Sequence, residues 1–530
     1  MKVFYWALLS FFVSVCNGQD LFSVHVIPST LNSTPAIHSG AFGMYNGKWI
    51  FLGGRIDGLH IMQANQAFPY YGRNDSVFVV DPILNSYHAA AISDLPFILY
   101  EALGSSNMQY YQEGSHLYMI GGYGKSDSTG VYTTFPSLIS IDLDCLTANV
   151  NTGASINSCF RQIRDSVFAV SGGELEKIDS TYYLVFGHQF EGTYAETPQL
   201  SNFVQRYTNE IRKFNINDDG INLSISNYSA IVDTDNFHRR DFNLVPQIFP
   251  NGSTGLTAFG GVFQKTAIMP YLTPIDITAL NVTHQSSFNQ NLNQYTAAHL
   301  PIFDLGSNSM HTIFFGGMSL YTLDTTSHSL VQDTLIPFVK TISKVTRDVS
   351  WGLSESQMNE SMPFYLGTNA FFIPDTSVHY WDGKILDVNS LSGNTRVGFI
   401  VGGIKSDSTN IAHLDPSGMS RPNAQVYEVF IDKTIDQISE VAVDNHINNL
   451  FVYPNPAHEL LNIDFELPNS GKCELAIYSV KGKLIRNLFN GLTIEGKKHF
   501  SFSTEGIKSG IYLCRIISGN SKKIVKVIIE

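Results

Sequence analysis

The sequence predicts an all-β protein in which one kind of small sheet recurs, followed by a second and smaller β domain. Charged residues make up only 15% of the 530 residues, against a usual share of about 25%. Hydrophobic residues reach 43% and glycine occurs 42 times, a balance that suits many strands and turns and is too apolar for a disordered chain. The length allows two or three domains.

A short apolar strand that ends in Gly-Gly, or nearly so, recurs six times. The copies end at Gly53-Gly54, Gly121-Gly122, Gly187-His188, Gly260-Gly261, Gly316-Gly317 and Gly402-Gly403. A second run of β-branched and aromatic residues follows most copies, as at 76–81, 138–142, 210–214 and 425–430. Each unit therefore reads as one four-stranded sheet with long loops. Six such units predict a six-bladed β-propeller.

The diglycine at the end of the second strand, and the third strand that ends in Asp, resemble the kelch family of β-propellers. The resemblance covers roughly residues 20–435, and we expect a kelch-like domain over 19–435. The units are longer than the usual kelch repeat of about 50 residues, and most lack its tryptophan. Glycine at the strand end allows close backbone approach and positive φ.

A ring of sheets needs a closing strand. Residues 21–28 alternate between apolar and polar side chains, as a strand does, and precede the first complete unit. We expect this segment to form the outer strand of the last blade beside 426–431, which would remove an exposed sheet edge.

The N-terminus reads as a secretory signal peptide over residues 1–18. Lys2 is followed by an apolar run over 3–15 and by the small residue Gly18, after which cleavage is expected. A lipoprotein that begins at Cys16 is the alternative, but Val15 fits that signal poorly. The apolar run is too short to span a membrane, and no other segment of the sequence is apolar enough to do so.

Residues 436–448 read as a linker, and five strand-like runs between 449 and 530 predict a small C-terminal β-sandwich. Four short motifs within it resemble the type A sorting domain of the type IX secretion system. They contain Pro454, Asn455, Pro456, Gly482, Lys483, Gly510, Tyr512 and Lys523. Ser479 stands where that family often has Asp. The resemblance implies a protein of the Bacteroidota that passes through the periplasm, engages the type IX secretion machinery, and is released or held at the outer-membrane surface.

The charge is divided unevenly between the two parts. The formal net charge is −13, yet the tail from residue 446 is basic, so the propeller region is the acidic part. An acidic body argues against nucleic-acid binding, because that needs a basic surface.

Four cysteines remain after cleavage of the signal peptide, and an exported chain can oxidise them. Cys145 and Cys159 flank a turn-rich stretch, where a hairpin could bring them together as a disulfide. Cys473 and Cys514 lie in two strand-like runs of the last domain and are a second candidate pair. The alternative is that each is a small buried apolar residue.

Polar residues next to the glycine-ended strands are the candidates for a site in the central funnel. They are His38, Arg55, Arg164, His188, Arg240, Asp241 and His299. If they share one mouth, they could bind an anionic or sugar ligand, because Arg pairs with carboxylates and His exchanges protons near neutral pH. The alternative is structural: such residues commonly tie neighbouring blades together.

No established catalytic or metal-binding spacing occurs in the sequence, and we expect neither a cofactor nor a metal. Two functions remain open. The first is an exported binding or adhesion module for a glycan or a protein. The second is a sugar-active enzyme of the central funnel, by analogy with kelch-type mutarotases.

Overall fold

The computed structural model describes residues 21–60, 67–194, 202–292, 295–324, 329–411, 419–433, 448–467, 471–479, 483–518 and 521–530. The chain divides into two compact units, 1–435 and 436–530, and each is described by itself. The predicted signal peptide and residues 436–447 of the predicted linker lie outside the described residues. No helix of the described chain is long and apolar enough to cross a membrane.

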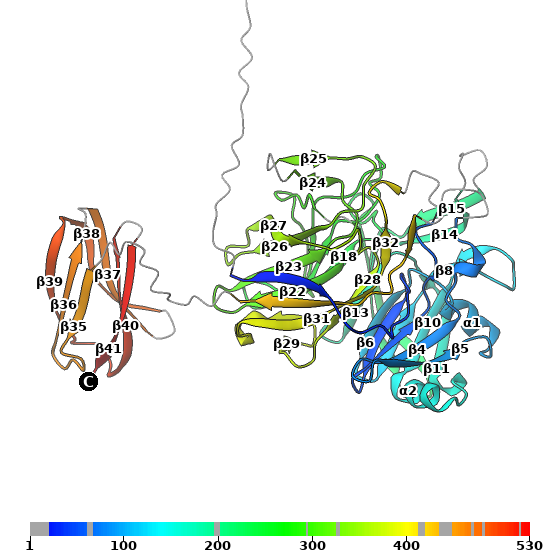
Figure 1. Ribbon diagram of the computed structural model, residues 1–530, viewed down its shortest axis with the longest axis horizontal. Helices are drawn as coiled ribbons and strands as arrows, with labels where there is room; N and C mark the ends of the chain where they lie inside the picture. Colours follow the sequence, from blue (N-terminus) through cyan, green and yellow to red (C-terminus); the bar gives the residue numbers. More distant parts are fainter. Residues whose placement is uncertain are drawn as a thin grey trace, which may run out of the picture. The chain divides into compact units, whose positions relative to one another are not determined.

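The first unit contains six sheets of four or more strands each (Figure 1). Sheet 1 has β2 (Ala41–Tyr45), β3 (Lys48–Leu52), β4 (Ser76–Asp81) and β5 (Ser86–Ala91). Sheet 2 has β6 (Gln109–Glu113), β7 (His116–Ile120), β10 (Pro136–Asp142) and β11 (Phe160–Ala169). Sheet 3 has β12 (Glu174–Ile178), β13 (Thr181–Val185), β16 (Glu210–Asp218) and β17 (Leu223–Val232).

The remaining three sheets follow the same antiparallel plan. Sheet 4 has β18 (Asn243–Ile248), β19 (Thr254–Phe259), β20 (Ile275–Ile277) and β21 (Val282–His284). Sheet 5 has β22 (Ala298–Asp304), β23 (Ser309–Phe315), β26 (Thr341–Arg347) and β27 (Leu353–Ser361), extended by β30 (Ile385–Asp387) and β29 (Tyr380–Trp381). Sheet 6 has β28 (Ala370–Pro374), β31 (Asn394–Gly402), β34 (Tyr427–Asp432) and β1 (Ser23–Pro28).

Backbone hydrogen bonds at the diglycines link the sheets into a ring. The N–H of the second residue after each glycine-ended strand donates to a carbonyl that leads into the next sheet. These pairs are Gly54 to Ser105, Gly122 to Val170, Gly187 to Arg239, Gly317 to Leu366 and Gly403 to Ile37, at 2.8–3.0 Å. Sheets 4 and 5 are joined instead through the Asn243 side chain, which accepts from the Ala297 N–H at 2.7 Å. Because the last pair returns to sheet 1, the domain is a β-propeller.

The first glycine of the pair is required by how closely the next sheet approaches. At Gly121, φ is +68°, and an added Cβ would lie 1.9 Å from the Val170 carbonyl oxygen. In sheet 3 the bridge between Ser171 and His188 aligns Gly187 with the second glycine of the other copies. Phe186 therefore takes the place of the first glycine and adopts φ +51° itself.

The N-terminal strand closes the last sheet, as the sequence predicted. Strand β1 pairs antiparallel with β34, with Val24 opposite Ile431 and Val26 opposite Val429. Figure 1 shows β1 (blue) among strands from the later part of the propeller. Val24 and Val26 are buried, while the strand's other face is more open, which is the alternation of a half-buried strand.

Long connections follow the diglycines and form a cap over the end of the ring at which the diglycines lie. Four of them are hairpins: β8 (Tyr123–Lys125) with β9 (Tyr132–Thr134), β14 (His188–Thr193) with β15 (Asn202–Tyr207), β24 (Tyr321–Leu323) with β25 (Leu330–Gln332), and β32 (Ile404–Ser406) with β33 (Ser420–Pro422). Their apolar side chains pack together, with Phe338 and Ile404 in one cluster and Tyr123 against Phe190 in another.

The predicted disulfide between Cys145 and Cys159 is present, but the predicted hairpin is not. Cys145 lies on helix α2 (Leu143–Thr152), and Cys159 ends the short helix η2 (Asn157–Cys159). The Asp142 side chain caps α2 by accepting from two backbone N–H groups, and Gly153 ends it at φ +71°. The other helices of the described residues are α1 (Phe97–Leu103), η1 (Tyr70–Gly72) and η3 (Val388–Ser390).

The second unit is a β-sandwich, as predicted. A three-stranded sheet of β35 (Asn448–Tyr453), β36 (Leu460–Leu467) and β39 (Gly496–Ser503) packs on a four-stranded sheet of β38 (Leu484–Thr493), β37 (Gly471–Ser479), β40 (Gly510–Ser518) and β41 (Ser521–Ile529). Both sheets contribute buried side chains to one core, among them Ile463 and Ile477.

The second predicted disulfide is wrong. Cys473 and Cys514 are both free and fully buried. Strands β37 and β40 pair so that Cys473 faces Ser518 while Cys514 faces Ile477. The two thiols are thus offset by four residues along the strands, or roughly 13 Å at about 3.3 Å per residue, which is too far for a disulfide.

Candidate functional site

A cavity of about 230 Å³ lies on the axis of the propeller. Its lining comes from residues 39–40, 107–110, 172–176, 241–244, 296–299 and 369–372. Each segment leads into, or forms the start of, the first strand of a different sheet. All six sheets therefore contribute to one site, which is where a propeller places its central funnel.

The upper rim of the cavity is built from residues in the left-handed backbone region. Ser39, Asn107, Gly172, Asp241 and Asn369 all have φ between +51° and +63°. Successive members are joined by backbone hydrogen bonds: the N–H of Asn107 donates to Ser39, that of Gly172 to Asn107, and that of Asp241 to Gly172, at 2.8–3.0 Å. Asn, Asp and Gly tolerate this conformation best, so the backbone geometry itself favours polar side chains here.

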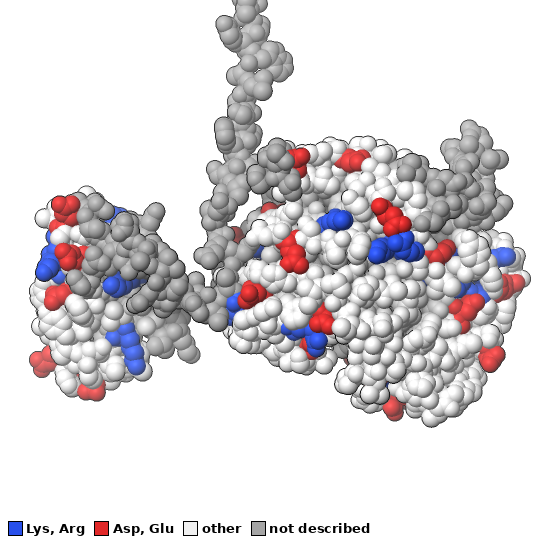
Figure 2. Space-filling model, viewed as in Figure 1, with Lys and Arg blue, Asp and Glu red and all other residues white. Residues whose placement is uncertain are grey.

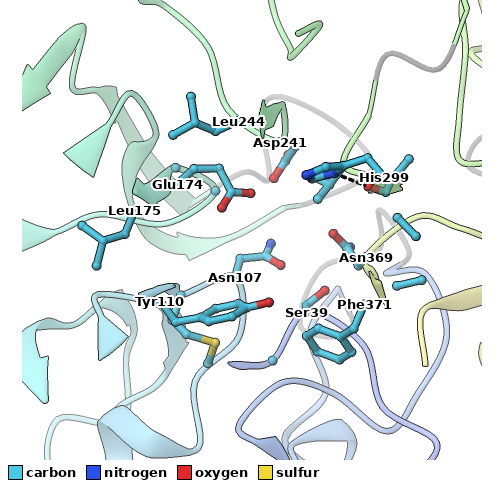
Figure 3. Close-up of a pocket in the computed structure, with 18 of the residues that line it drawn as sticks. Ser39, Asn107, Tyr110, Glu174, Leu175, Asp241, Leu244, His299, Asn369 and Phe371 are labelled. Carbon is cyan, nitrogen blue, oxygen red and sulfur yellow. Dashed lines mark hydrogen bonds between the residues drawn. The ribbon is translucent and has the colours of Figure 1, made fainter. Parts of the chain in front are cut away.

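Four polar side chains that sheets 2, 3 and 6 contribute to the lining have no hydrogen-bond partner among the described residues. Asn107, Tyr110, Glu174 and Asn369 come from sheets 2, 3 and 6, and Figure 3 shows them pointing toward the same space. Enclosed polar groups are normally paired within the protein. Their free donors and acceptors are therefore available to a molecule in the cavity.

The pKa of Glu174 is raised to about 8. Burial is the main cause, and the neighbouring Glu176 and Asp241 carboxylates add to it. The carboxyl is thus largely neutral at pH 7. Burial, and then the charges of Glu174 and Glu176, also hold the pKa of Tyr110 above its ordinary value, so its phenol stays protonated. At neutral pH the cavity offers a carboxylic acid, a phenol and two amides.

Asp241 and His299 complete the polar lining. Burial raises the pKa of Asp241, and Arg240 opposes that shift through an ion pair in which Nε lies 3.1 Å from Oδ2. Burial lowers the pKa of His299, and its Nδ1 donates to the Ala297 carbonyl at 3.0 Å. The neutral ring then has Nε2 left as an acceptor. Figure 3 shows the His299 ring beside Asp241.

Of the seven predicted site residues, Asp241 and His299 line the cavity. Arg240 does not line the cavity but forms an ion pair with Asp241, and it also donates to the Tyr207 hydroxyl at 2.8 Å. His188 lies in the cap, where its Nδ1 is 2.6 Å from the Gln205 amide. Burial, followed by the nearby Arg240 charge, holds its pKa well below the ordinary value.

The other three predicted residues do not reach the cavity. His38 is 3% exposed and donates from Nε2 to the Asp57 carbonyl at 3.0 Å; burial lowers its pKa to about 4. Arg55 binds the Asp57 carboxylate with two nitrogens, at 2.7 and 2.5 Å. His38 and Arg55 therefore have a structural role, in which each binds Asp57. Arg164 is exposed on β11, the outer strand of sheet 2, on the far side of that sheet from the lining strand β6.

The sequence analysis missed Asn107, Tyr110, Glu174 and Asn369. One signal was present: in sheets 1 to 3, the rim residue stands fourteen positions before the first left-handed residue of the diglycine turn. Longer connections in sheets 4 to 6 break that spacing, so the sequence does not show the five rim positions as one set.

A hairpin reaches the lower edge of the cavity. Strands β29 and β30 lie in the connection between β28 and β31 of sheet 6, and β30 pairs in parallel with β22 of sheet 5. Lys384 at its turn forms an ion pair with Glu176, which lines the cavity. The Lys384 ammonium also lies 4.0 Å from the centre of the Tyr111 ring in sheet 2.

The surface charge agrees with the low charged content of the sequence. On the face in Figure 2, charged side chains form small mixed groups separated by wide uncharged areas. In the part of the chain that the structure describes, no three His, Cys, Asp or Glu side chains are placed to hold a metal ion.

Residues 451–530 match the family described as the secretion system C-terminal sorting domain. The C-terminal unit is a sorting domain of the type IX pathway, as its motifs predicted, and it indicates delivery to the cell surface or outer-membrane region. The sorting motif at 454–456 has a structural role. The Asn455 side chain donates to the Lys526 carbonyl at 2.9 Å and accepts from the Ile528 N–H at 2.8 Å. Asn455 thus joins the start of the domain to its last strand.

Several solved structures are similar to the chain at low identity. They include the structure of YjhT, with 10% identity and a TM-score of 0.42, covering 74% of this chain and 99% of that one. A fungal alcohol oxidase of the AA5 family in complex with copper has 8% identity and a TM-score of 0.37, covering 96% and 100%. PorZ of Porphyromonas gingivalis, a surface component of the type-IX secretion system, has 9% identity and a TM-score of 0.27, covering 95% and 61%. No curated protein matches the chain.

Proposed function

We propose that the chain is an exported binding protein, secreted or held at the cell surface, whose propeller binds a small polar ligand such as a sugar in its central cavity. The sorting domain supports the destination, and through it the chain would engage the type IX secretion machinery after a signal peptide at 1–18 has directed it to the periplasm. The enclosed set of unpartnered side chains, Asn107, Tyr110, Glu174 and Asn369, carries the binding role.

The chemistry of the lining suits a polyhydroxylated ligand. Amide, phenol and carboxyl groups can each donate and accept hydrogen bonds, which sugar hydroxyls require. Phe371 and Phe372 add apolar wall, and a few oriented polar groups within an apolar frame are typical of small-molecule sites. The volume of about 230 Å³ admits a monosaccharide-sized molecule rather than a long glycan.

The test is a ligand screen on the mature chain from residue 19. Saturation-transfer NMR against monosaccharides and disaccharides should identify at least one binder, and the Asn107→Ala/Asn369→Ala double variant should lose it. Asn151→Ala is the matched control, because Asn151 is exposed on α2 and does not line the cavity. Binding that survives in the double variant, or no binder at all, would contradict the proposal.

A second function remains in view because of one observation: a carboxyl with a pKa of about 8 lies in the same cavity as the neutral His299. A group with a pKa near neutrality is suited to general acid–base catalysis, so a sugar-active isomerase is the alternative. Exchange NMR on each sugar that binds distinguishes the two. Faster interconversion of anomers with the wild type than with Glu174→Gln would identify an enzyme; equal rates would identify a binder.

A further inference from the structure

We infer that the ligand of the central cavity carries one positively charged amino group among its hydroxyls, as an amino sugar does. This inference rests on the proposed function and specifies its ligand class. It follows from the balance of charge in the lining, from the aromatic walls, and from the one carboxyl that no protein cation neutralises.

The lining holds three carboxyl groups and no Lys or Arg. Two of them are already neutralised from outside the cavity: Glu176 by Lys384, and Asp241 by Arg240. Glu174 has no ion pair and no hydrogen bond within the described residues. A ligand with one cationic group would therefore balance the lining, whereas an anionic ligand would meet carboxyl groups and no Lys or Arg.

The groups around Glu174 do not supply a positive charge. His299 is held neutral by burial, and the Tyr110 phenol is uncharged. Arg240 is engaged with Asp241 and with the Tyr207 hydroxyl. The carboxyl stays protonated in the free protein because nothing near it favours the charged form.

Aromatic side chains of the lining suit an ammonium group as well. The rings of Tyr110 and Phe371 lie edge to face, with centroids 6.5 Å apart, and both line the cavity. Aromatic faces attract cations, and more strongly where water is excluded. The amides of Asn107 and Asn369 are left for the hydroxyl groups of the same ligand.

Binding should release a proton, and the balance is simple. The protonated Glu174 carboxyl loses its proton to the buffer, and the resulting carboxylate pairs with the incoming ammonium, which keeps its own protons. With a pKa of about 8 in the free protein, the group is protonated at a pH of about 6.5, where an amino sugar is also protonated. A neutral sugar would bind the carboxylic acid and release nothing.

The experiment is isothermal titration of the mature chain with glucosamine, glucose and N-acetylglucosamine at a pH of about 6.5, in two buffers with different ionisation enthalpies. We expect glucosamine to bind about tenfold tighter than either neutral sugar, a difference of about 1.4 kcal/mol. Release of up to one proton per site should accompany glucosamine alone. Glu174→Gln should bring glucosamine to the affinity of glucose, while Glu191→Gln, a change at an exposed site on β14, should not.

The outcomes separate this inference from the proposed function. If the three sugars bind equally, or if glucosamine keeps its advantage in Glu174→Gln, the amine inference is overturned and the binding function stands. If none of the three binds and the wider sugar screen is also empty, both are overturned. Circular dichroism of Glu174→Gln, which should match the wild type, ensures that a lost preference is not a lost fold.

Discussion

Lys384 and Glu176 are 208 residues apart in the sequence, yet their ion pair holds the β29–β30 hairpin against the inner strand of sheet 3. Glu176 is a lining residue, so the contact fixes the hairpin at the edge of the cavity. The rest of the hairpin is attached to sheet 5, where Leu386 pairs with Ile302. The turn is thus the part of the hairpin that the contacts of one side chain, Lys384, hold at the cavity edge.

Replacing Lys384 by alanine should loosen this turn without unfolding the domain. A partly exposed ion pair contributes only about 1 kcal/mol or less, so the overall unfolding midpoint should change little. Hydrogen exchange of peptides over 379–387 should become several-fold faster. Lys177→Ala is the control, because Lys177 forms its ion pair with Glu113 and not with Glu176; unchanged exchange in Lys384→Ala would show that the ion pair does not hold the turn.

The diglycine turns give a second prediction, through a pair of matched glycines. Gly121→Ala forces an alanine to φ +68° and places its Cβ 1.9 Å from the Val170 carbonyl oxygen. Gly130→Ala imposes a similar φ of +72°, but nothing lies within 4 Å of the new Cβ. We expect about 1 kcal/mol of destabilisation at Gly130 from the backbone alone, and about 3 kcal/mol or more at Gly121, where the next sheet must also move.

Tryptophan fluorescence during urea unfolding measures this difference in the mature chain. Three of the four tryptophans, Trp49, Trp351 and Trp381, belong to the propeller, and Trp6 lies in the proposed signal peptide, so the sorting domain does not contribute to the signal. A Gly121→Ala protein that is too unstable to recover folded agrees with the prediction. Equal midpoints for the two variants would contradict the close approach of sheets 2 and 3.

These turns also show what the sequence could and could not predict. Glycine is needed where a side chain would collide with a neighbouring carbonyl, so this requirement is visible at single positions of the sequence. Six glycine-ended strands, with further strand-like runs between them, were sufficient to predict the repeated sheets and the closing strand β1. No comparable residue pattern in the sequence indicates the cavity. Asn107 and Asn369, from sheets 2 and 6, line one cavity only because the ring closes, and their distance along the chain depends on connections of different lengths.

Two smaller errors have local causes. The stretch between Cys145 and Cys159 was interpreted as a hairpin because of its turn-forming residues, but Asp142 and Gly153 are helix-capping signals. Arg240 and Asp241 were predicted to line one site, yet their side chains and that of the neighbouring Arg239 point to different places. The Arg239 guanidinium is fully buried and donates to the carbonyls of Gly260 and Thr273, whereas Asp241 lines the cavity.

The raised pKa of Glu174 predicts how stability varies with pH. An unfolded glutamate ionises near pH 4.3, while the folded carboxyl ionises near 8. Between these values the folded protein binds more protons than the unfolded chain, so Glu174 lowers the free energy of unfolding progressively as pH rises from about 4.3 to about 8. Below that window the effect is absent.

Glu174→Gln removes the ionisation and should therefore remove this loss. The urea midpoints of the variant and the wild type should be similar at a pH of about 4.5 and diverge up to a pH of about 8, with the variant more stable. Glu191→Gln should follow the wild type throughout, because Glu191 is exposed. A constant gap between Glu174→Gln and the wild type at all pH values would show that Glu174 ionises normally.

The sorting domain gives the last prediction, which concerns export. The two units are separate compact bodies, so removing 451–530 should leave the propeller folded but without its address. In the native host, with the proposed signal peptide at 1–18 kept, the truncated protein should accumulate in the periplasm, and the full chain should appear at the surface or in the medium. Fractionation followed by immunoblotting measures this directly.

A single side chain tests the same domain more finely. Asn455→Ala removes both hydrogen bonds that join the start of the domain to β41, each worth about 1 kcal/mol, and the last strand carries the basic end that the sorting motif includes. Surface delivery of Asn455→Ala should fall, while Asn490→Ala, a change at an exposed site on β38, should be exported like the wild type. Normal secretion of the truncated chain would show that the address lies outside residues 451–530.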